Sequence, residues 1–483
     1  MKYFYPYKVE DRFWVYDRYS NKITEVDELT YKIIASYSKH HFDEEKVTRY
    51  LKDLADKEDL AEKTRDIKHY QKEYDIFKPF NLYRCIMPVT DRDLEIKYEN
   101  EIHHFIYNLT KDCNLRCKYC KFGGTYVGVK THNTNSMSYD IIDESINLIK
   151  QYYKKKETLF IAFYGGEPLM EFKKMKYIVK KIKYFYDNVS FSFTTNGTLL
   201  NKKIIEFLIK NDFLLMISLD GSKDIHNNNR VTKNGRETFD IIIKRINEIK
   251  ENNIRYYNRN VGFVVTIAPP YNLIEIINFF EKNTNINQRL FVSAVEPFGT
   301  SYFDNFNMKI QNKKLRKQYK ELIEEYIILK TKNIYNLRTK ILNDFFGIAL
   351  LELDDRYIFP LESSQIPPNG ACFPGLKSLF INIDGKLGMC EKVNDQITFG
   401  DVKNGININK VKYIYKNYCG LVDKMCLNCW AYRLCKSCYI ESISDGRNSL
   451  KRKLEYCHIK KEEIINNLET YTRIKMHNSD AFM

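Results

Sequence analysis

The chain has 483 residues, 44% of them hydrophobic, which is enough for roughly three domains that each bury a core. Its net charge of +15 comes from Lys residues spread along the whole chain, without a basic stripe that alternates with aromatics, so we predict no nucleic-acid partner. Because the start has no apolar h-region and no apolar run approaches the ~18 residues of a membrane span, we expect no membrane insertion and a cytoplasmic location.

Residues 1–98 contain no catalytic constellation. Residues 13–16 and 22–26 are typical of short strands around a turn, and helices are expected near 27–38 and 44–56. This order, with Asp27-Glu28-Leu29-Thr30 opening a helix, resembles the winged-helix-like, PqqD-like recognition element of enzymes that modify ribosomally made peptides. The resemblance implies a strand edge that pairs with a leader peptide. The alternative is a plain N-terminal cap packed on the next domain.

Between residues 103 and 296, short apolar runs alternate with stretches of helical period. Six β-then-α units predict an α/β fold with a parallel sheet and outer helices, because parallel neighbours need crossover connections. This is a partial (β/α)6, TIM-like barrel, in which chemistry lies just after the strands. The expected strands are 103–109, 158–164, 189–194, 214–219, 261–267 and 290–295, and the later helices are 171–186, 201–211, 238–252 and 273–283.

The loop after the first strand contains Cys113, Cys117 and Cys120 with the spacing C-x3-C-x2-C. In a reducing compartment, clustered cysteines are more often metal ligands or catalytic groups than disulfides. Three thiolates this close can hold three irons of a 4Fe-4S cube and leave the fourth iron without a protein ligand. A zinc site is the weaker alternative: no fourth ligand lies at the usual spacing, although His103 and His104 are near.

The cysteine motif resembles that of the radical SAM superfamily. In that family the open iron binds the amino and carboxylate groups of S-adenosylmethionine (SAM), and a 5'-deoxyadenosyl radical abstracts hydrogen. By this resemblance Tyr119 touches the adenine. The segment Gly165-Gly166-Glu167-Pro168 is similar to the GGE motif, in which the backbone and the carboxylate hold the SAM ammonium.

Later strand ends extend the resemblance. The segment Thr194-Thr195-Asn196-Gly197 corresponds to one that lies near the cofactor, and Ser218 resembles a residue that contacts SAM. Arg230 stands where related enzymes pair an arginine with the SAM carboxylate, for which the planar guanidinium is suited. Arg230 as a solvated loop charge is the alternative.

Eight of the twelve cysteines lie between residues 372 and 457. An Asp384-Gly385 turn between two apolar runs predicts a hairpin that brings Cys372 and Cys390 toward one another. By spacing alone, the later cysteine pairs are also compatible with a zinc ribbon. The full order resembles the SPASM extension of radical SAM enzymes. That resemblance assigns Cys372, Cys390 and Cys438 to an inner auxiliary 4Fe-4S cluster, and Cys426, Cys429, Cys435 and Cys457 to an outer one.

Two departures from the SPASM pattern affect this assignment. The last spacing of the quartet is x2 instead of x3, which leaves Cys435 and Cys438 less firmly assigned. Some relatives have another cysteine shortly before the position of Cys372, and this chain has none there. The inner cluster then has an open iron, unless Cys419 closes it; a plain buried thiol is the other interpretation of Cys419.

Glu391 directly follows Cys390, where sulfatase-maturing relatives carry an acidic residue proposed as a base. A carboxylate in a dehydrated site can take a substrate proton. The alternative is a surface ion pair with Lys392 or another lysine.

Together, the resemblances predict a radical SAM oxidoreductase that matures a ribosomally made peptide, with thioether cross-linking favoured. The alternatives are carbon–carbon cross-linking, formylglycine formation by a sulfatase-type maturase, and a cluster-bearing or zinc-bearing peptide sensor without catalysis. Expected partners are a precursor peptide with a leader and an electron donor such as flavodoxin or ferredoxin. The predicted parts are 1–98 for recognition, 99–300 for the barrel, a helical bridge at 301–365 and the SPASM region 366–483.

Overall fold

The computed structural model describes residues 4–39, 49, 57–76, 90–126, 131–154, 157–283, 286, 289–358, 370–393, 395, 397–426, 429–444 and 447–482. Apart from residue 49, the helix expected at 44–56 lies outside these residues. None of the described helices is long and apolar enough to cross a membrane.

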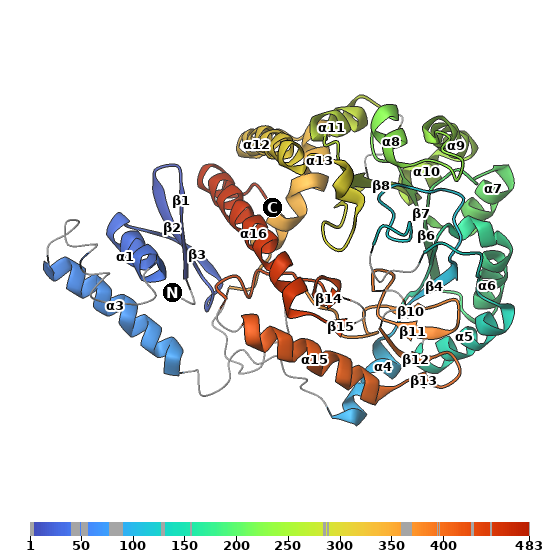
Figure 1. Ribbon diagram of the computed structural model, residues 1–483, viewed down its shortest axis with the longest axis horizontal. Coiled ribbons are helices and arrows are strands. Elements are labelled where there is room, and N and C mark those ends of the chain that lie inside the picture. Colours follow the sequence, from blue (N-terminus) through green and yellow to red (C-terminus); the bar gives the residue numbers. More distant parts are fainter. Residues whose placement is uncertain are drawn as a thin grey trace.

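Six consecutive parallel strands form one side of the largest sheet, out to its edge strand, as the sequence predicts (Figure 1). Their pairing is sequential, so each strand lies beside the next one along the chain. All six match the expected strands to within one residue at each end. They are β4 (His104–Thr110), β5 (Leu159–Gly165), β6 (Val189–Thr195), β7 (Leu214–Ser218), β8 (Val261–Ile267) and β9 (Leu290–Ala294).

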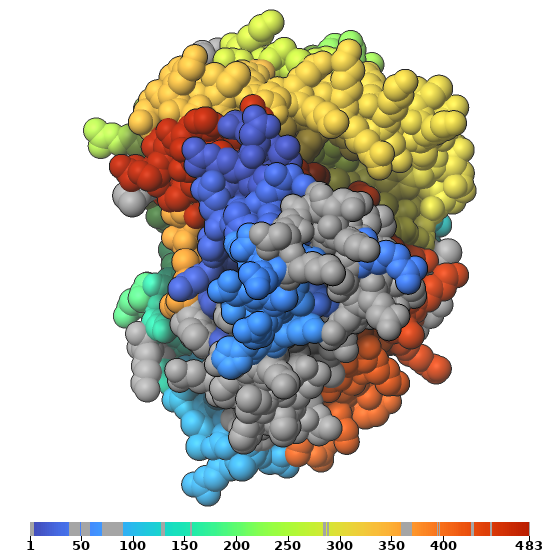
Figure 2. All heavy atoms as spheres, turned by 90° about the vertical axis from the view of Figure 1, so that its left-hand side faces the viewer, coloured from blue at the N-terminus to red at the C-terminus, as the bar shows by residue number. Residues whose placement is uncertain are grey.

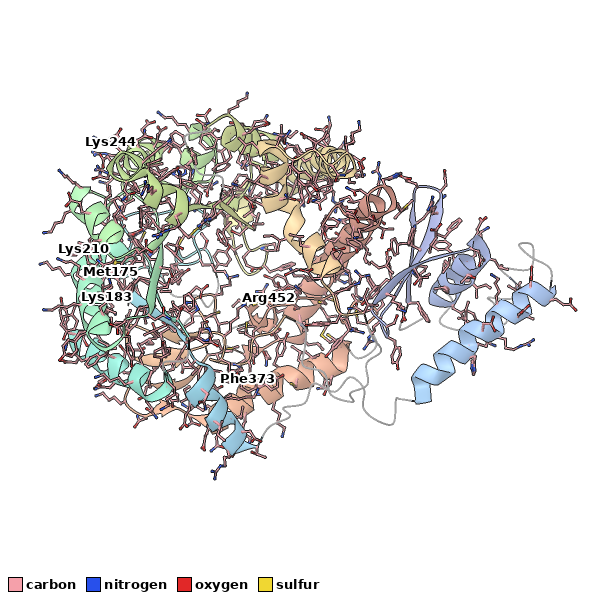
Figure 3. All side chains as sticks on the ribbon, turned by 180° about the vertical axis from the view of Figure 1, so that it is seen from behind. Met175, Lys183, Lys210, Lys244, Phe373 and Arg452 are labelled. Atoms are coloured by element: carbon pink, nitrogen blue, oxygen red, sulfur yellow. The ribbon has the colours of Figure 1, made fainter. Side chains whose placement is uncertain are left out.

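Helices cover the outer face of this sheet (Figure 1). Their apolar sides are buried; Ile142, Ile146 and Ile149 form such a side behind the N-cap Ser138. Figure 3 shows Lys183, Lys210 and Lys244 on the outer helices, consistent with lysines spread over a solvated surface. The helices are α5 (Tyr139–Tyr152), α6 (Phe172–Phe185), α7 (Lys202–Lys210), α8 (Lys223–Asn229), α9 (Phe239–Asn252), α10 (Ile254–Asn260) and α11 (Leu273–Lys282), with the short η2 (Pro168–Glu171).

The C-terminal hairpin extends the barrel sheet. β10 (Leu379–Ile381) and β11 (Lys386–Gly388) form the hairpin expected around Asp384-Gly385. β10 also pairs in parallel with β4, and the sheet continues through β12 (Thr398–Asp401) and β13 (Gly405–Ile406) to ten strands. The segment after β11, which carries Cys390 and Glu391, therefore lies beside the barrel.

Helices connect the barrel to this extension and then pack across it. The bridging segment has η3 (Tyr302–Asn305), α12 (Met308–Thr331), α13 (Leu337–Leu342), η4 (Asn343–Gly347) and α14 (Ile348–Asp354). The last part contains α15 (Ile408–Cys426), η6 (Tyr439–Ser442), a small hairpin of β14 (Ile443–Ser444) and β15 (Arg447–Asn448), and α16 (Leu450–His477). Arg452 of α16 lies near the middle of the molecule, with its guanidinium 5.7 Å from the ring centre of Phe298 (Figure 3).

The N-terminal part is a three-stranded antiparallel sheet with helices, β1 (Phe4–Val9), β2 (Arg12–Asp17), β3 (Lys22–Val26), α1 (Glu28–Lys39) and α3 (Lys57–Ile76); α4 (Asp91–Glu101) then leads into the barrel. Its β1 packs on α16, where the Tyr7 hydroxyl lies 2.7 Å from Thr472 Oγ1. Tyr5 stacks on Trp430 at 4.0 Å between ring centres. Figure 2 shows this segment in blue beside the red C-terminal helix. The N-terminal sheet is thus attached to the C-terminal region.

Candidate functional site

The three-cysteine loop is fastened to the chain segment that follows α8. The Arg116 N–H donates to the Val231 carbonyl at 2.8 Å, and the Lys118 N–H donates to the Asn229 carbonyl at 3.0 Å. These backbone bonds connect the loop after β4 to the loop after β7. The cysteines are therefore held at the carboxyl ends of the strands, which is where barrels of this kind have their active sites.

Cys113 is buried, Cys117 and Cys120 are partly buried, and the three thiols lie close enough to influence one another electrostatically. Burial raises the pKa of Cys113 to about 12 and that of Cys117 to about 11, and the neighbouring thiols contribute to both rises. The N–H of Leu115 and the Asn196 amide point at Cys113 Sγ, at 3.4 and 3.8 Å. Donors aimed at sulfur suit a thiolate, so this donor set fits a cluster whose binding displaces the thiol protons.

His132 also lies beside the cysteines, although no sequence motif had indicated a role for it. Its Nε2 lies 3.7 Å from Cys120 Sγ, while its Nδ1 lies 3.1 Å from the carbonyl oxygen of Lys111. The interpretation of His103 and His104 as zinc ligands is wrong. Both lie at the start of β4, and a seven-residue strand separates them from the cysteine loop by about 20 Å.

The two glycines of the Gly165-Gly166-Glu167 segment allow the cysteine loop to lie directly on β5. A Cβ at Gly166 would stand 2.1 Å from the carbonyl oxygen of Asp112. A Cβ at Gly165, where φ is +151°, would stand 2.5 Å from the carbonyl oxygen of Thr110. The Glu167 N–H donates to that Asp112 carbonyl at 2.9 Å. Side chains at either glycine would therefore displace the loop that carries the cysteines.

Glu167 is a buried carboxyl that joins two strand ends. It accepts hydrogen bonds from the Thr195 hydroxyl at 2.8 Å, the Asn196 N–H at 2.8 Å and the Leu169 N–H at 3.1 Å. Burial raises its pKa to about 7, although these three donors act in the opposite direction. The structure places Glu167 and Asn196 side by side, and Asn196 also donates to Asn114 Oδ1 at 2.9 Å.

Tyr119 and Arg230 meet at a third residue, Asp220. The Tyr119 hydroxyl donates to Asp220 Oδ2 at 2.5 Å, and Arg230 Nε donates to the same oxygen at 2.9 Å. The N–H of Thr266 donates to the other oxygen at 3.0 Å. Arg230 is only 7% exposed, so its interpretation as a solvated loop charge is wrong. Ser218, at the end of β7, is buried two residues before Asp220.

The structure separates the C-terminal cysteines into two groups. One cavity is lined by all four cysteines expected around the outer cluster, Cys426, Cys429, Cys435 and Cys457. Four thiols from α15, the following loop and α16 thus face one space, which fits a four-cysteine cluster. Among the described residues, no three His, Cys, Asp or Glu side chains converge as ligands of a single metal ion. The zinc-ribbon alternative therefore gains no support from the geometry.

The second group lies near the barrel. Burial raises the pKa of Cys390 to about 11, and the charges of Glu391 and Cys438 add to the rise, so both groups lie near this thiol. Cys372 is exposed, and two residues earlier Gly370 touches the backbone of Lys436, close in sequence to Cys438. Cys419 is buried and disulfide-bonded, so in this structure it is neither a cluster ligand nor a plain thiol.

Tyr164, at the end of β5, lies between the two cysteine regions. Its pKa is raised by burial and then by Glu391, Cys120 and Cys390, so all three groups act on one hydroxyl. Glu391 is partly buried, and no lysine or arginine among the described residues forms an ion pair with it. A small pocket lies beside Tyr164, and the Lys111–Asp395 ion pair of 2.8 Å belongs to its lining.

The sequence of the barrel matches a known family. Residues 107–282, from β4 to the last residue of α11, match the model described as the Radical SAM superfamily. The expected radical SAM enzyme and its cofactors, 4Fe-4S iron–sulfur and SAM, are confirmed.

Curated relatives extend the similarity beyond the barrel. The chain is 26% identical over 368 residues to a cysteine-type anaerobic sulfatase-maturating enzyme of Clostridium perfringens. The aligned residues cover 72% of this chain and 92% of that protein. An enzyme of the same name from Clostridium novyi is 25% identical over 340 residues, 68% of this chain and 85% of the relative.

Among solved structures, native anSMEcpe with bound AdoMet and Cp18Cys peptide matches 78% of this chain and 99% of its own. The TM-score is 0.55 at 21% identity, a likeness of fold.

Proposed function

We propose that this radical SAM enzyme modifies a ribosomally made peptide and forms thioether cross-links from cysteine. The observation that carries the proposal is the position of Glu391. This carboxylate acts on the Tyr164 hydroxyl, near the end of β5, together with Cys120 and Cys390. A proton acceptor is thus available between the two regions that hold the cysteines.

The cofactors, when bound at Cys113, Cys117 and Cys120, supply a 5'-deoxyadenosyl radical that takes hydrogen from a carbon of the peptide. The protein's own residues supply position and exclude water. Glu167 and Arg230 are the groups we assign to the ammonium and the carboxylate of SAM, with Tyr119 at the adenine. Asp220 holds Tyr119 and Arg230 in place through its hydrogen bonds to both.

Thioether formation joins a cysteine sulfur to a carbon and removes two hydrogens from the peptide. One hydrogen would leave the carbon with the radical, the thiol proton would go to Glu391, and a cluster bound at the inner cysteines would supply the acceptor for the remaining electron. Cys372, Cys390 and Cys438 would hold the inner cluster, and because they are only three thiols, a substrate thiolate would complete a set of four soft ligands.

Peptide analysis tests this proposal. The purified enzyme, SAM and dithionite are incubated anaerobically with small cysteine-containing peptides encoded by open reading frames next to its gene. We expect 5'-deoxyadenosine and a product lighter by two hydrogens whose linked cysteine resists iodoacetamide, even after reduction. A product that has lost two hydrogens but still alkylates at every cysteine would contradict thioether formation and indicate carbon–carbon coupling.

Formylglycine formation is the second candidate, and the names of the curated relatives favour it. In that reaction a single cysteine becomes an aldehyde, which a hydrazide probe would label. The Glu391→Gln variant separates the role of the carboxylate from cofactor binding. It should slow product formation more than SAM cleavage if Glu391 takes the substrate proton, whereas equal slowing of both would assign it a structural role.

A further inference from the structure

Lys453 places a buried ammonium at the four-cysteine cavity. The residue lies on α16, is 5% exposed and lines the cavity with Cys426, Cys429, Cys435 and Cys457. Its Nζ donates to the Ser437 hydroxyl at 3.0 Å and lies 5.4 Å from the ring centre of Tyr418. Both of these contacts are to neutral groups.

No carboxylate among the described residues forms an ion pair with Lys453, whereas Lys460, a second lysine of the same cavity lining, is paired, and the third, Lys461, is partly exposed to solvent. Lys460 lies 3.4 Å from Glu441 and 3.0 Å from Glu463. Burying an uncompensated ammonium is costly, so a buried cation normally faces an anion. A 4Fe-4S cluster held by four thiolates is an anion, and the cavity that Lys453 lines is the one with four cysteines.

We propose that Lys453 is the internal counter-ion of the outer auxiliary cluster and raises its reduction potential. The inference rests on the cluster lying in this cavity and is independent of which peptide bond the enzyme makes. Reduction adds one negative charge to the cluster, and a nearby fixed positive charge stabilises the reduced form in a site with little water. The outer cluster then becomes a better acceptor for the electron released during substrate oxidation.

Redox titration of the reconstituted full chain, followed by electron paramagnetic resonance, tests the proposal. The outer-cluster signal is defined as the one lost in Cys426→Ala/Cys429→Ala. In Lys453→Met we expect the ratio of reduced to oxidised outer cluster at a fixed potential to fall about tenfold, which is a downward shift of about 59 mV for one electron. Lys453→Arg should stay close to the wild type because it keeps the charge.

Lys460→Met is the matched control, since it removes a cation of the same cavity that carboxylates already compensate. A shift in Lys460→Met as large as in Lys453→Met would overturn the proposal, as would an unchanged potential in Lys453→Met with full iron. If Lys453→Met loses the outer iron while Lys453→Arg retains it, the counter-ion role is supported. Loss in both variants would assign Lys453 a packing role instead. Failure of the thioether proposal would appear only in the peptide products and leave these potentials unchanged.

Discussion

Single residues decide how the cysteine loop meets the sheet. Gly166 and the backbone of Asp112 approach so closely that a Cβ at Gly166 would stand 2.1 Å from a carbonyl oxygen. This carbonyl oxygen belongs to Asp112, the residue before Cys113. A Cβ at Gly166 would therefore fit only if the backbone that carries Cys113 moved. Close packing alone thus requires glycine at this position of the GGE motif, whether or not the Glu167 carboxylate contacts a cofactor.

Gly166→Ala should therefore move the cysteine loop and slow SAM cleavage. Misplacing reacting groups by about 1 Å costs about 10²-fold in rate, so we expect a loss of that order, measured as 5'-deoxyadenosine released per iron. Gly420→Ala on α15 is the control, because a Cβ there meets nothing within 4 Å. Equal rates for Gly166→Ala and the wild type would show that the loop tolerates the displacement.

Glu167 should make SAM binding depend on pH. Its pKa is raised to about 7 by burial. In the proposed SAM site, the ionised carboxylate of Glu167 is the form that holds the ammonium. Affinity should be constant above that pH and fall about tenfold for each unit below it, because binding then has to displace a proton. Calorimetry on the reconstituted enzyme measures this. Glu167→Gln should bind more weakly at high pH and lose the pH dependence; the same slope in this variant would assign the titration to another group.

At the scale of elements, the barrel could be predicted from the sequence. Parallel strands that are buried on both faces appear in a sequence as short, continuous apolar runs. The short helices α8 and α10 were missed, since seven residues carry too little periodicity to stand out. β1 was missed because it is a short edge strand that contains Pro6, and proline argues against a strand unless it lies at an edge.

Contacts between distant segments were harder to predict. The Asp-Gly turn identified the hairpin, but nothing local shows that β10 pairs with β4. The buried Asp220–Arg230 pair and the place of His132 beside Cys120 also depend on which loops meet. The cysteine spacing left Cys435 and Cys438 uncertain, whereas the fold places Cys435 at the four-cysteine cavity and Cys438 near Cys390.

The loop after α15 should contribute to one cluster without affecting the others. Reconstituted wild-type protein should contain about 12 iron and about 12 sulfide per chain, as three 4Fe-4S clusters require. Cys426→Ala/Cys429→Ala should lower both to about 8 and leave some SAM cleavage that is uncoupled from product. Replacing Cys113, Cys117 and Cys120 by Ala should give a similar metal content but no cleavage. Stoichiometric zinc with iron near four would contradict the auxiliary assignment.

At the scale of the whole molecule, the N-terminal sheet is coupled to the C-terminal region. Arg433, between Cys429 and Cys435, donates to the Tyr19 carbonyl at 2.6 Å, and Tyr5 stacks on Trp430 in the same loop. β1 packs on α16, while β3 is the other edge of the described sheet and its residues are exposed or partly exposed. This leaves β3 as the edge on which an extended peptide can add as a strand.

We propose that the leader of the precursor peptide pairs with β3, and Thr24 allows a test in the full chain. Thr24→Pro removes one backbone N–H from β3, the edge strand whose residues are exposed or partly exposed, and the melting temperature of the variant shows whether the pairing of β3 with β2 survives. Affinity for the leader, expected to be of order micromolar, should fall at least about tenfold by fluorescence anisotropy. Thr24→Val, which keeps the N–H and the β-branched shape, should bind as the wild type does. Modification of a leaderless peptide should be slow and equal in all three proteins, because the barrel is unchanged. Unaltered leader affinity in Thr24→Pro, with a melting temperature matching the wild type, would remove β3 as the recognition edge.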